Sequence, residues 1–185
     1  MHIFFLAICS SLFFATQVLG QDHTSCSGAQ MDWYTGVVGE TPCRTYERLR
    51  QICNAEYQVG QMNSSLPPDF CTDQKSACCC NSIAFTLSML CLNCQAPIGT
   101  GSGYDAPAGT LQNYLNASID GTHKSHCYVP TYQNFTTDIQ TAVCNQNMKI
   151  LDDMYTVAWR DGSWYTRDSH IFTGQSADLY SLPRF

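Results

Sequence analysis

Three adjacent cysteines, Cys78, Cys79 and Cys80, are the residues of this sequence with the greatest potential for chemistry. Cysteine side chains serve as nucleophiles, as metal ligands or as disulfide partners. Neighbouring side chains on a helix point about 100° apart, and zinc motifs leave two to four residues between paired cysteines. One metal ion could therefore not collect all three thiolates. The triplet predicts three disulfides that leave one helix for three different distant cysteines.

The N-terminus indicates the compartment in which these thiols are oxidised. Residues 3–19 form an apolar stretch that ends in Val18-Leu19-Gly20, and this pattern is typical of a secretory signal peptide with a small-residue cleavage site. We therefore expect a signal peptide over residues 1–20 and a single extracellular domain over residues 21–185. The alternative is an uncleaved membrane anchor, for which the stretch is marginal, because a span needs about 20 residues.

Of the twelve cysteines, only Cys9 lies in the predicted signal peptide. In an oxidising compartment, cysteines at this density predict a disulfide framework. Antiparallel packing of the first two expected helices would pair Cys43 with Cys91 and Cys53 with Cys80, with close neighbours nearly as favourable. The cysteines expected in disulfides are Cys43, Cys53, Cys71, Cys78, Cys79, Cys80, Cys91, Cys94, Cys127 and Cys144.

An odd number of mature cysteines leaves one without an internal partner. Cys26 is the first candidate, because it lies near the predicted mature N-terminus between small polar residues. We expect it to stay free or to link a second copy of the chain as a disulfide-bonded dimer. Cys144 is the alternative.

The sequence disfavours two more specific roles for the cysteines. Cys91 and Cys94 have redox-motif spacing, but they follow an apolar helical run, and a helix C-terminus does not stabilise a thiolate. The same two cysteines could bind zinc together with His123 and His126. Secretion favours disulfides and two loop histidines instead, so the sequence predicts no metal and no cofactor.

Three sequons predict N-glycosylation, at Asn63, Asn116 and Asn134. Four aromatic residues could contact a ligand by stacking on a sugar, although packing in a small core is the more common role of such residues. These four are Trp33, Tyr34, Trp159 and Trp164.

The formal net charge of −6 disfavours nucleic acid as a partner. The expected partner is a protein or a cell-wall glycan. Residues 83–92 form the longest apolar run after the N-terminus, and that length suits a buried core helix rather than a membrane span. Membrane attachment would need a spanning segment that this sequence does not contain.

Four helices are expected. The first follows Thr41 as N-cap and Pro42 as first helical residue and ends near residue 53, with its arginines on the outer face. The second covers residues 72–94, the third residues 107–116, and the fourth begins with a capping box from Thr137 to Gln140. The predicted fold is mainly α and disulfide-rich, with about four helices around a central cysteine-rich helix.

The C-terminal region predicts a small β-hairpin. Residues 155–159 are rich in strand formers, and Asp161-Gly162 is a two-residue turn signal that would place Trp159 opposite Trp164. The alternative for residues 150–159 is a helix.

Catalytic signals are weak. The sequence holds no nucleophile elbow, no zinc-protease motif and no phosphate loop. Asp152 and Asp153 are adjacent carboxylates, for which solvated charges are the more common explanation. The sequence thus predicts a secreted or cell-surface domain that binds without catalysis, and the alternative is a secreted hydrolase that uses carboxylates as acid and base.

Several strings of the sequence are similar to those of one known group of proteins. They are Met31-Asp32-Trp33-Tyr34, Val38-Gly39-Glu40-Thr41-Pro42-Cys43-Arg44-Thr45-Tyr46, Leu49-Arg50-Gln51-Ile52-Cys53-Asn54, Cys78-Cys79-Cys80-Asn81-Ser82-Ile83-Ala84-Phe85, Leu87-Ser88-Met89-Leu90-Cys91-Leu92-Asn93-Cys94-Gln95 and Asp161-Gly162-Ser163-Trp164. The strings resemble cysteine-rich ectodomains of mushroom-forming fungi, which have no assigned activity. Members of that group typically continue into a Ser/Thr-rich linker, a transmembrane helix and a cytoplasmic tail, whereas this sequence ends at Phe185. The resemblance implies a role at the cell surface and transfers no catalytic residue.

Overall fold

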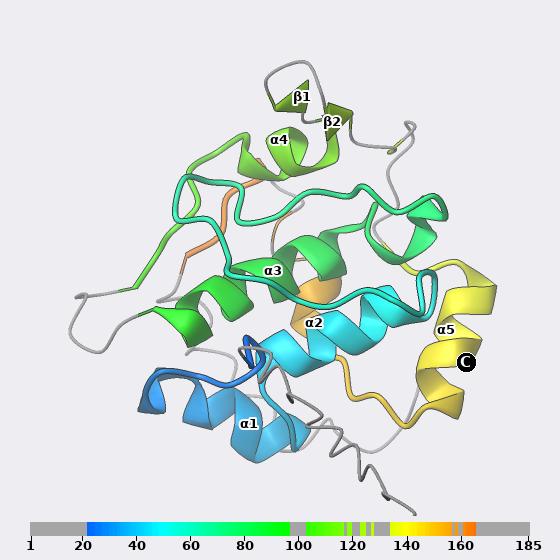
Figure 1. Cartoon of the computed structure of the whole chain (residues 1–185), viewed down its shortest axis with the longest axis horizontal. Helices are drawn as coiled ribbons and strands as arrows, with labels where there is room; N and C mark the ends of the chain where they lie inside the picture. Colours follow the sequence, from blue (N-terminus) through cyan, green and yellow to red (C-terminus); the bar gives the residue numbers. More distant parts are fainter. Residues whose placement is uncertain are drawn as a thin grey trace, which may run out of the picture.

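The computed structural model describes residues 22–96, 103–116, 118–119, 123–124, 127, 134–156, 158 and 161–165. These residues form a mainly helical, disulfide-rich fold (Figure 1). The elements in chain order are the 3₁₀ helix η1 (Ala29–Met31), α1 (Asp32–Val38), α2 (Pro42–Gln51), η2 (Ser76–Cys78), α3 (Ser82–Gln95), α4 (Thr110–Asn116), β1 (Ser118–Ile119), β2 (His123–Lys124), α5 (Thr137–Asn145) and η3 (Asp152–Tyr155). The predicted signal peptide lies outside the described residues.

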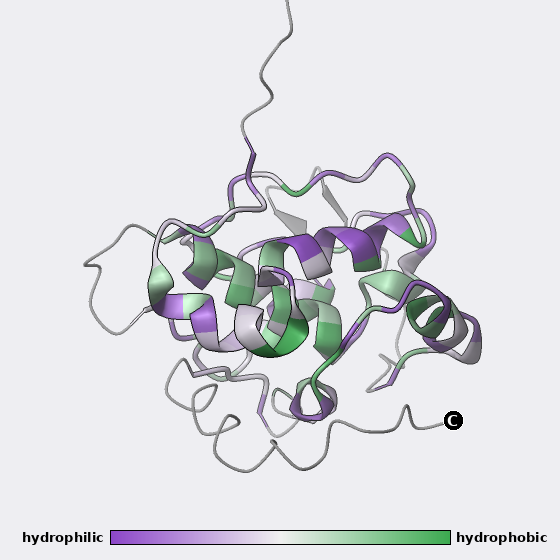
Figure 2. Cartoon of the chain, turned by 90° about the horizontal axis from the view of Figure 1, so that it is seen from below, coloured by the Kyte–Doolittle hydropathy of each residue, from purple (hydrophilic) through white to green (hydrophobic). Residues whose placement is uncertain are grey.

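Helix α3 carries no charged side chain and is buried from Ser82 to Cys94. Such a helix is stable only when neighbours cover it on every side, and α3 packs against α2, α4, η1 and η3. Hydrophobic residues accordingly lie mainly on the helices at the centre of the molecule, while the loops at its periphery are mostly hydrophilic (Figure 2).

The second predicted helix begins ten residues too early. The Asn81 side chain accepts a hydrogen bond from the Ala84 backbone N–H at 2.8 Å and caps α3. Asn81 is itself extended, with φ −147°, so it separates α3 from η2. The cysteine triplet therefore lies at the end of η2 and in the following turn, not on the α-helix.

Helix α2 begins as predicted, with Thr41 accepting from the Arg44 backbone N–H at 3.2 Å and Pro42 in the first turn. The prediction for its arginines is wrong in part. Arg44 is exposed, but Arg50 is 1% exposed and points into the protein.

Helix α5 begins at the predicted residue, but the capping box does not form. Thr136 is the N-cap, and its hydroxyl bonds the Asp138 carboxylate instead of the helix backbone. Thr137 is therefore the first helical residue rather than the cap.

The expected C-terminal hairpin is not confirmed. Tyr155 ends a 3₁₀ helix, and Trp164 forms an antiparallel bridge with Ala106 through hydrogen bonds of 2.7 and 2.9 Å. Trp159 lies outside the described residues. The carbonyls of Asp161 and Gly162 accept from Gly109 and Leu111, and they thereby satisfy backbone donors at the start of α4.

We predict that Gly162→Ala destabilises the fold by about 1–2 kcal/mol, because its φ of +79° is costly for any residue with a Cβ. An added Cβ would also lie 2.0 Å from the Gln112 side chain, which would have to move. Chemical denaturation measures the loss. Gly36→Ala is the control: it lies in α1 with open space around it, and we expect a gain of up to about 1 kcal/mol. A neutral Gly162→Ala would contradict the prediction.

Among the described residues, no helix has both the length and the apolar composition needed to cross a bilayer.

Candidate functional site

Five disulfides cross-link the described chain: four join residues 25 to 68 positions apart, and the fifth joins residues 8 positions apart. Each member of the triplet bonds a different cysteine outside it, and Cys43 bonds Cys91 at one end of the α2–α3 pair. The pairs are Cys26–Cys94, Cys43–Cys91, Cys53–Cys78, Cys71–Cys79 and Cys80–Cys127. Bridges of this kind constrain the unfolded chain and stabilise a domain by about 2–4 kcal/mol each.

Two predictions about the cysteines are wrong: Cys26 is not the cysteine without a partner, and Cys144 does not form a disulfide. Cys26 is bonded to Cys94, so it is neither free nor the link to a second copy of the chain. The Ser27 backbone N–H donates to the Cys94 carbonyl at 2.8 Å and helps to hold the N-terminal segment against the end of α3. Cys53 bonds Cys78, one of the close neighbours that antiparallel packing also allowed, instead of Cys80. Within the described part of the chain, Cys144 on α5 is the cysteine that forms no disulfide.

The disulfides also remove the thiolates that redox or zinc chemistry would need. Cys91 and Cys94 belong to two different bridges, so they form neither a redox pair nor a pair of zinc ligands as they stand. His123 is in β2, and His126 lies outside the described residues.

The predicted ligand-contact aromatics are mostly interior. Tyr34 and Trp164 are buried at 0% and 1% exposure, so neither offers a ring face to a sugar. Trp33 is half-buried and packs against the core, and Trp159 lies outside the described residues. The prediction that Tyr34 and Trp164 stack on a sugar is therefore wrong, because both side chains pack in the hydrophobic core.

All three sequon asparagines are exposed: Asn63 in a loop, Asn116 at the end of α4 and Asn134 before α5. Asn63 also accepts a hydrogen bond from the Ser65 backbone N–H at 2.8 Å. Glycosylation at these positions remains a prediction.

The candidate site is the long loop from Asn54 to Lys75, which we call the α2–η2 loop. It contains no helix or strand, and it crosses α2 and α3 in Figure 1. Loops of this length inside a compact domain are commonly either functional or disordered. The buried contacts described next show that this one is held in a single arrangement.

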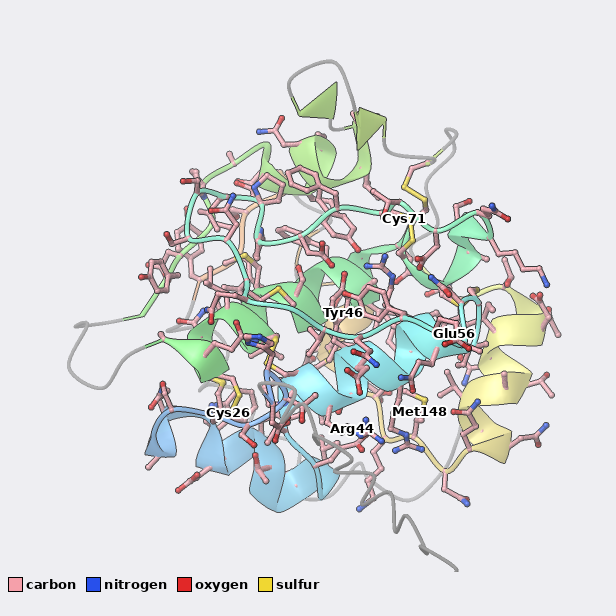
Figure 3. All side chains as sticks on the ribbon, viewed as in Figure 1. Cys26, Arg44, Tyr46, Glu56, Cys71 and Met148 are labelled. Atoms are coloured by element: carbon pink, nitrogen blue, oxygen red, sulfur yellow. A yellow bond between two sulfur atoms is a disulfide. The ribbon has the colours of Figure 1, made fainter. Side chains whose placement is uncertain are left out.

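Arg50 of α2 anchors the second half of the loop. Its Nε donates to Asp73, whose side chain is 3% exposed, and its Nη1 donates to Asp69 at 3.1 Å. The Asp69 carboxylate also accepts from the hydroxyls of Tyr46, at 2.8 Å, and Tyr57, at 2.9 Å. We call these five residues the Arg50 cluster; Tyr46 is labelled in Figure 3.

Electrostatics keep Arg50 charged and the two tyrosines of the Arg50 cluster protonated. Burial alone would lower the pKa of Arg50, but Tyr46 and the hydrogen bond to Asp73 raise it, so the guanidinium stays charged. Burial raises the pKa of Tyr46 and of Tyr57 well above the ordinary tyrosine value. The Arg50 guanidinium also lies 4.1 Å from the centre of the Tyr57 ring, within cation–π range.

Two further side chains hold the first half of the loop. Glu47 of α2 accepts from the Val59 backbone N–H at 2.9 Å. Gln95, the last residue of α3, accepts from the Met62 N–H at 2.7 Å and donates to the Gly60 carbonyl at 2.9 Å. Val59 and Met62 are buried, so their backbone N–H groups would be costly to leave unpaired.

The outward side of the α2–η2 loop is polar and mostly uncharged. Of its exposed side chains, most end in amides or hydroxyls, which donate and accept hydrogen bonds. The exposed residues are Asn54, Ala55, Glu56, Gln58, Gly60, Gln61, Asn63, Ser64, Ser65, Thr72, Gln74 and Lys75.

Two sets of described carboxylates bear on the hydrolase alternative: those that hold the α2–η2 loop, and the adjacent pair Asp152 and Asp153. Asp69 accepts from Arg50 and from two tyrosine hydroxyls, and Asp73 accepts from Arg50 and the Asn54 amide. Both carboxylates thus act as acceptors that hold the loop. Asp152 is exposed at the start of η3, and Asp153 beside it has its pKa raised by burial and by the charge of Asp152. The raised pKa favours the protonated form of the Asp153 carboxyl.

The fold and the loop define a class: a mainly helical domain held by five disulfides, which fits an extracellular or secreted protein. Comparisons of the chain with protein-family models, with curated proteins and with solved structures found no match.

Proposed function

We propose that this chain is a secreted or cell-surface recognition domain without catalytic activity, and that the α2–η2 loop contacts its ligand. One observation carries the proposal: a long loop without regular structure is fixed from beneath by buried charges and presents amides and hydroxyls outward. Binding residues are often carried by loops on a rigid scaffold. A loop that is ordered before binding also loses less conformational entropy on association.

The chemistry of the loop favours a neutral, hydroxyl-rich ligand. Gln58, Gln61 and Ser64 offer hydrogen bonds to sugar hydroxyls and add no charge. A cell-wall glycan fits this surface better than a strongly charged partner does. The signal-peptide-like N-terminus and the resemblance to fungal ectodomains also favour a position outside the cell.

Co-sedimentation of the full chain, produced through a secretory pathway, with insoluble chitin and β-glucan tests the proposal. We expect saturable binding that weakens at least about tenfold in the variant Gln58→Ala/Ser64→Ala, since lost hydrogen bonds at a desolvated contact cost about 1 kcal/mol or more each. Gln112→Ala/Asn113→Ala removes exposed polar side chains from α4 and is the control. If neither polysaccharide binds, the glycan assignment is wrong; if only the α4 variant loses binding, the loop assignment is wrong.

One observation supports the alternative, a secreted hydrolase: the pKa of the Asp153 carboxyl is raised. A carboxyl that keeps its proton can act as a general acid. Release of reducing ends from the same polysaccharides measures this activity. Release by the full chain that disappears in Asp153→Asn would replace the non-catalytic proposal by the hydrolase.

A further inference from the structure

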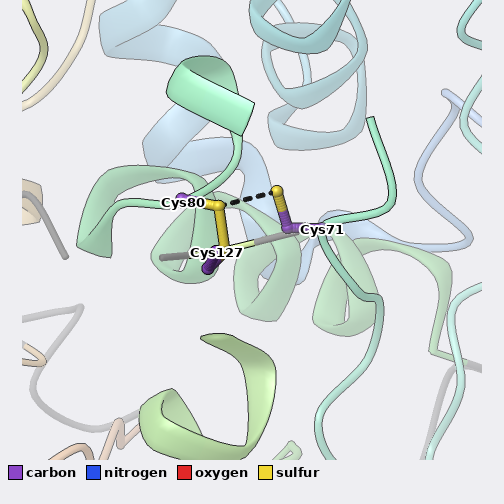
Figure 4. A group of neighbouring side chains, drawn as sticks. All are labelled: Cys71, Cys80 and Cys127. Carbon is purple, nitrogen blue, oxygen red and sulfur yellow. Dashed lines mark hydrogen bonds between the residues drawn. A yellow bond between two sulfur atoms is a disulfide. The ribbon is translucent and has the colours of Figure 1, made fainter. Parts of the chain in front are cut away.

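The sulfur atoms of two disulfides lie unusually close together at the end of η2. Cys71 is bonded to Cys79, and Cys80 is bonded to Cys127. The Sγ atoms of Cys71 and Cys80 are nevertheless only 3.1 Å apart (Figure 4). Neither sulfur carries a hydrogen while both are oxidised, so this contact is not a hydrogen bond. It is close to the separation of about 3–3.5 Å at which positioned groups react.

Burial differs among these four cysteines. Cys71 and Cys79 are fully buried and Cys80 is 4% exposed, whereas Cys127 is half-buried. The Sγ atoms of Cys71, Cys80 and Cys127 all lie within 4.8 Å of one another. A small thiol from solvent therefore has its best access at Cys127, and the sulfur released by attack there is the one that faces Cys71.

We propose that Cys71, Cys79, Cys80 and Cys127 form a thiol–disulfide exchange site, in which Cys79 and Cys80 compete for Cys71. A small thiol of the glutathione class attacks Cys127 as its thiolate, forms a mixed disulfide there and expels Cys80 as a thiolate. Cys80 attacks the Cys71 sulfur, so the Cys71–Cys80 bond forms, the Cys71–Cys79 bond breaks and Cys79 leaves as a thiolate. Cys79 takes up the proton that the small thiol lost.

The exchange has a structural consequence for the two segments that these bridges tie down. Cys71 stays cross-linked to the cysteine triplet, so the end of the α2–η2 loop remains anchored. Cys127 loses its bond to the residue that precedes the N-cap of α3. A mildly reducing solution would therefore release the chain at Cys127 while the loop keeps its disulfide.

The variant Cys127→Ser tests the central step without any added thiol. It leaves Cys80 as a thiol beside the intact Cys71–Cys79 bond, and exchange then needs neither an oxidant nor a reductant. After incubation at pH 8, alkylation and fragmentation mass spectrometry locate the thiols. We expect comparable labelling of Cys79 and Cys80, in addition to Cys144. Label at Cys80 and none at Cys79 would overturn the proposal.

Cys80→Ser is the matched control, because it removes the same native bridge but replaces the sulfur that lies 3.1 Å from the Cys71 Sγ. The thiol that it frees, on Cys127, lies within 4.8 Å of the Cys71 Sγ without that close contact. We expect its label mainly at Cys127 and Cys144, with much less at Cys79 than in Cys127→Ser. If Cys127→Ser does not fold, the wild-type protein in a glutathione buffer gives the second test. Glutathione on Cys127 together with a free thiol on Cys79 supports the proposal, and a free thiol that stays on Cys80 overturns it.

Discussion

Arg50→Met is expected to destabilise the protein by about 3–5 kcal/mol, the cost of removing one partner from a buried ion pair. Arg50 is 1% exposed, and the side chain of Asp73 is 3% exposed, so water cannot replace the lost guanidinium. The Asp73 carboxylate would keep only the hydrogen bond from Asn54, at 3.3 Å. Guanidinium-induced unfolding, followed by circular dichroism, measures the loss.

Two further variants distinguish a buried charge from a general loss of packing. Lys75→Met removes an exposed cation from the same loop and should change stability by no more than about 0.5 kcal/mol. Adding Asp73→Asn to Arg50→Met removes the stranded charge, so the double variant should be more stable than Arg50→Met alone. A loss below about 1 kcal/mol for Arg50→Met would show that the Arg50 cluster does not hold the loop.

The Arg50 cluster also shows where sequence reasoning reaches its limit. The amphipathic pattern of residues 42–51 correctly gives a helix, because Thr41 and Pro42 act within the first turn. The same pattern places arginines on the outer face. Arg50 departs from it because its acidic partners come from an irregular loop 19 and 23 residues further along. An irregular loop has no periodicity, so nothing in the sequence shows that it folds back over α2.

At the C-terminal turn, too, the local feature was predicted correctly and the long-range contact was not. Asp161-Gly162 predicts a turn with positive φ, and Gly162 has φ +79°. Turn chemistry is local, but the choice of a pairing partner is not. Trp164 pairs with Ala106, which precedes α4, and no rule of adjacent strands indicates a partner so far back in the chain.

Cys26 shows that local sequence features near a terminus do not predict whether the segment is anchored by distant residues. Closeness to a terminus and polar flanks suggest a loose segment, yet Gln30 donates to the carbonyls of Asn93 and Ala96 at 3.1 and 3.2 Å. These bonds join segments more than 60 residues apart. The short helix α1, which the sequence did not reveal, continues directly from this anchored segment. The candidate site itself was also missed, because its polar exposed residues look like those of any solvated loop.

Stability is expected to fall steeply above about pH 10.5, because burial raises the pKa of four tyrosines well above their value in an unfolded chain. They are Tyr34, Tyr46, Tyr57 and Tyr114. Below about pH 10 each is protonated in both states, so this contribution to stability is fully present there. As the pH rises further, only the unfolded chain ionises, and unfolding releases protons. Each tyrosine then costs up to about 1.4 kcal/mol per pH unit.

Brief pH jumps, with tyrosinate absorbance and circular dichroism recorded together, measure this effect before alkali attacks the disulfides. We expect the four buried tyrosines to ionise only as the helical signal is lost. Tyr34→Phe is the most informative variant, because Tyr34 lies on α1, outside the Arg50 cluster, and its removal deletes one titrating group while the cluster stays intact. Its free energy of unfolding should fall less steeply with pH, by the equivalent of one proton, and at neutral pH it should be close to that of the wild type. Ionisation of all tyrosines in one step near pH 10, with the helices still folded, would mean that these hydroxyls are accessible to solvent and that the packing of α2 against the α2–η2 loop is looser than described.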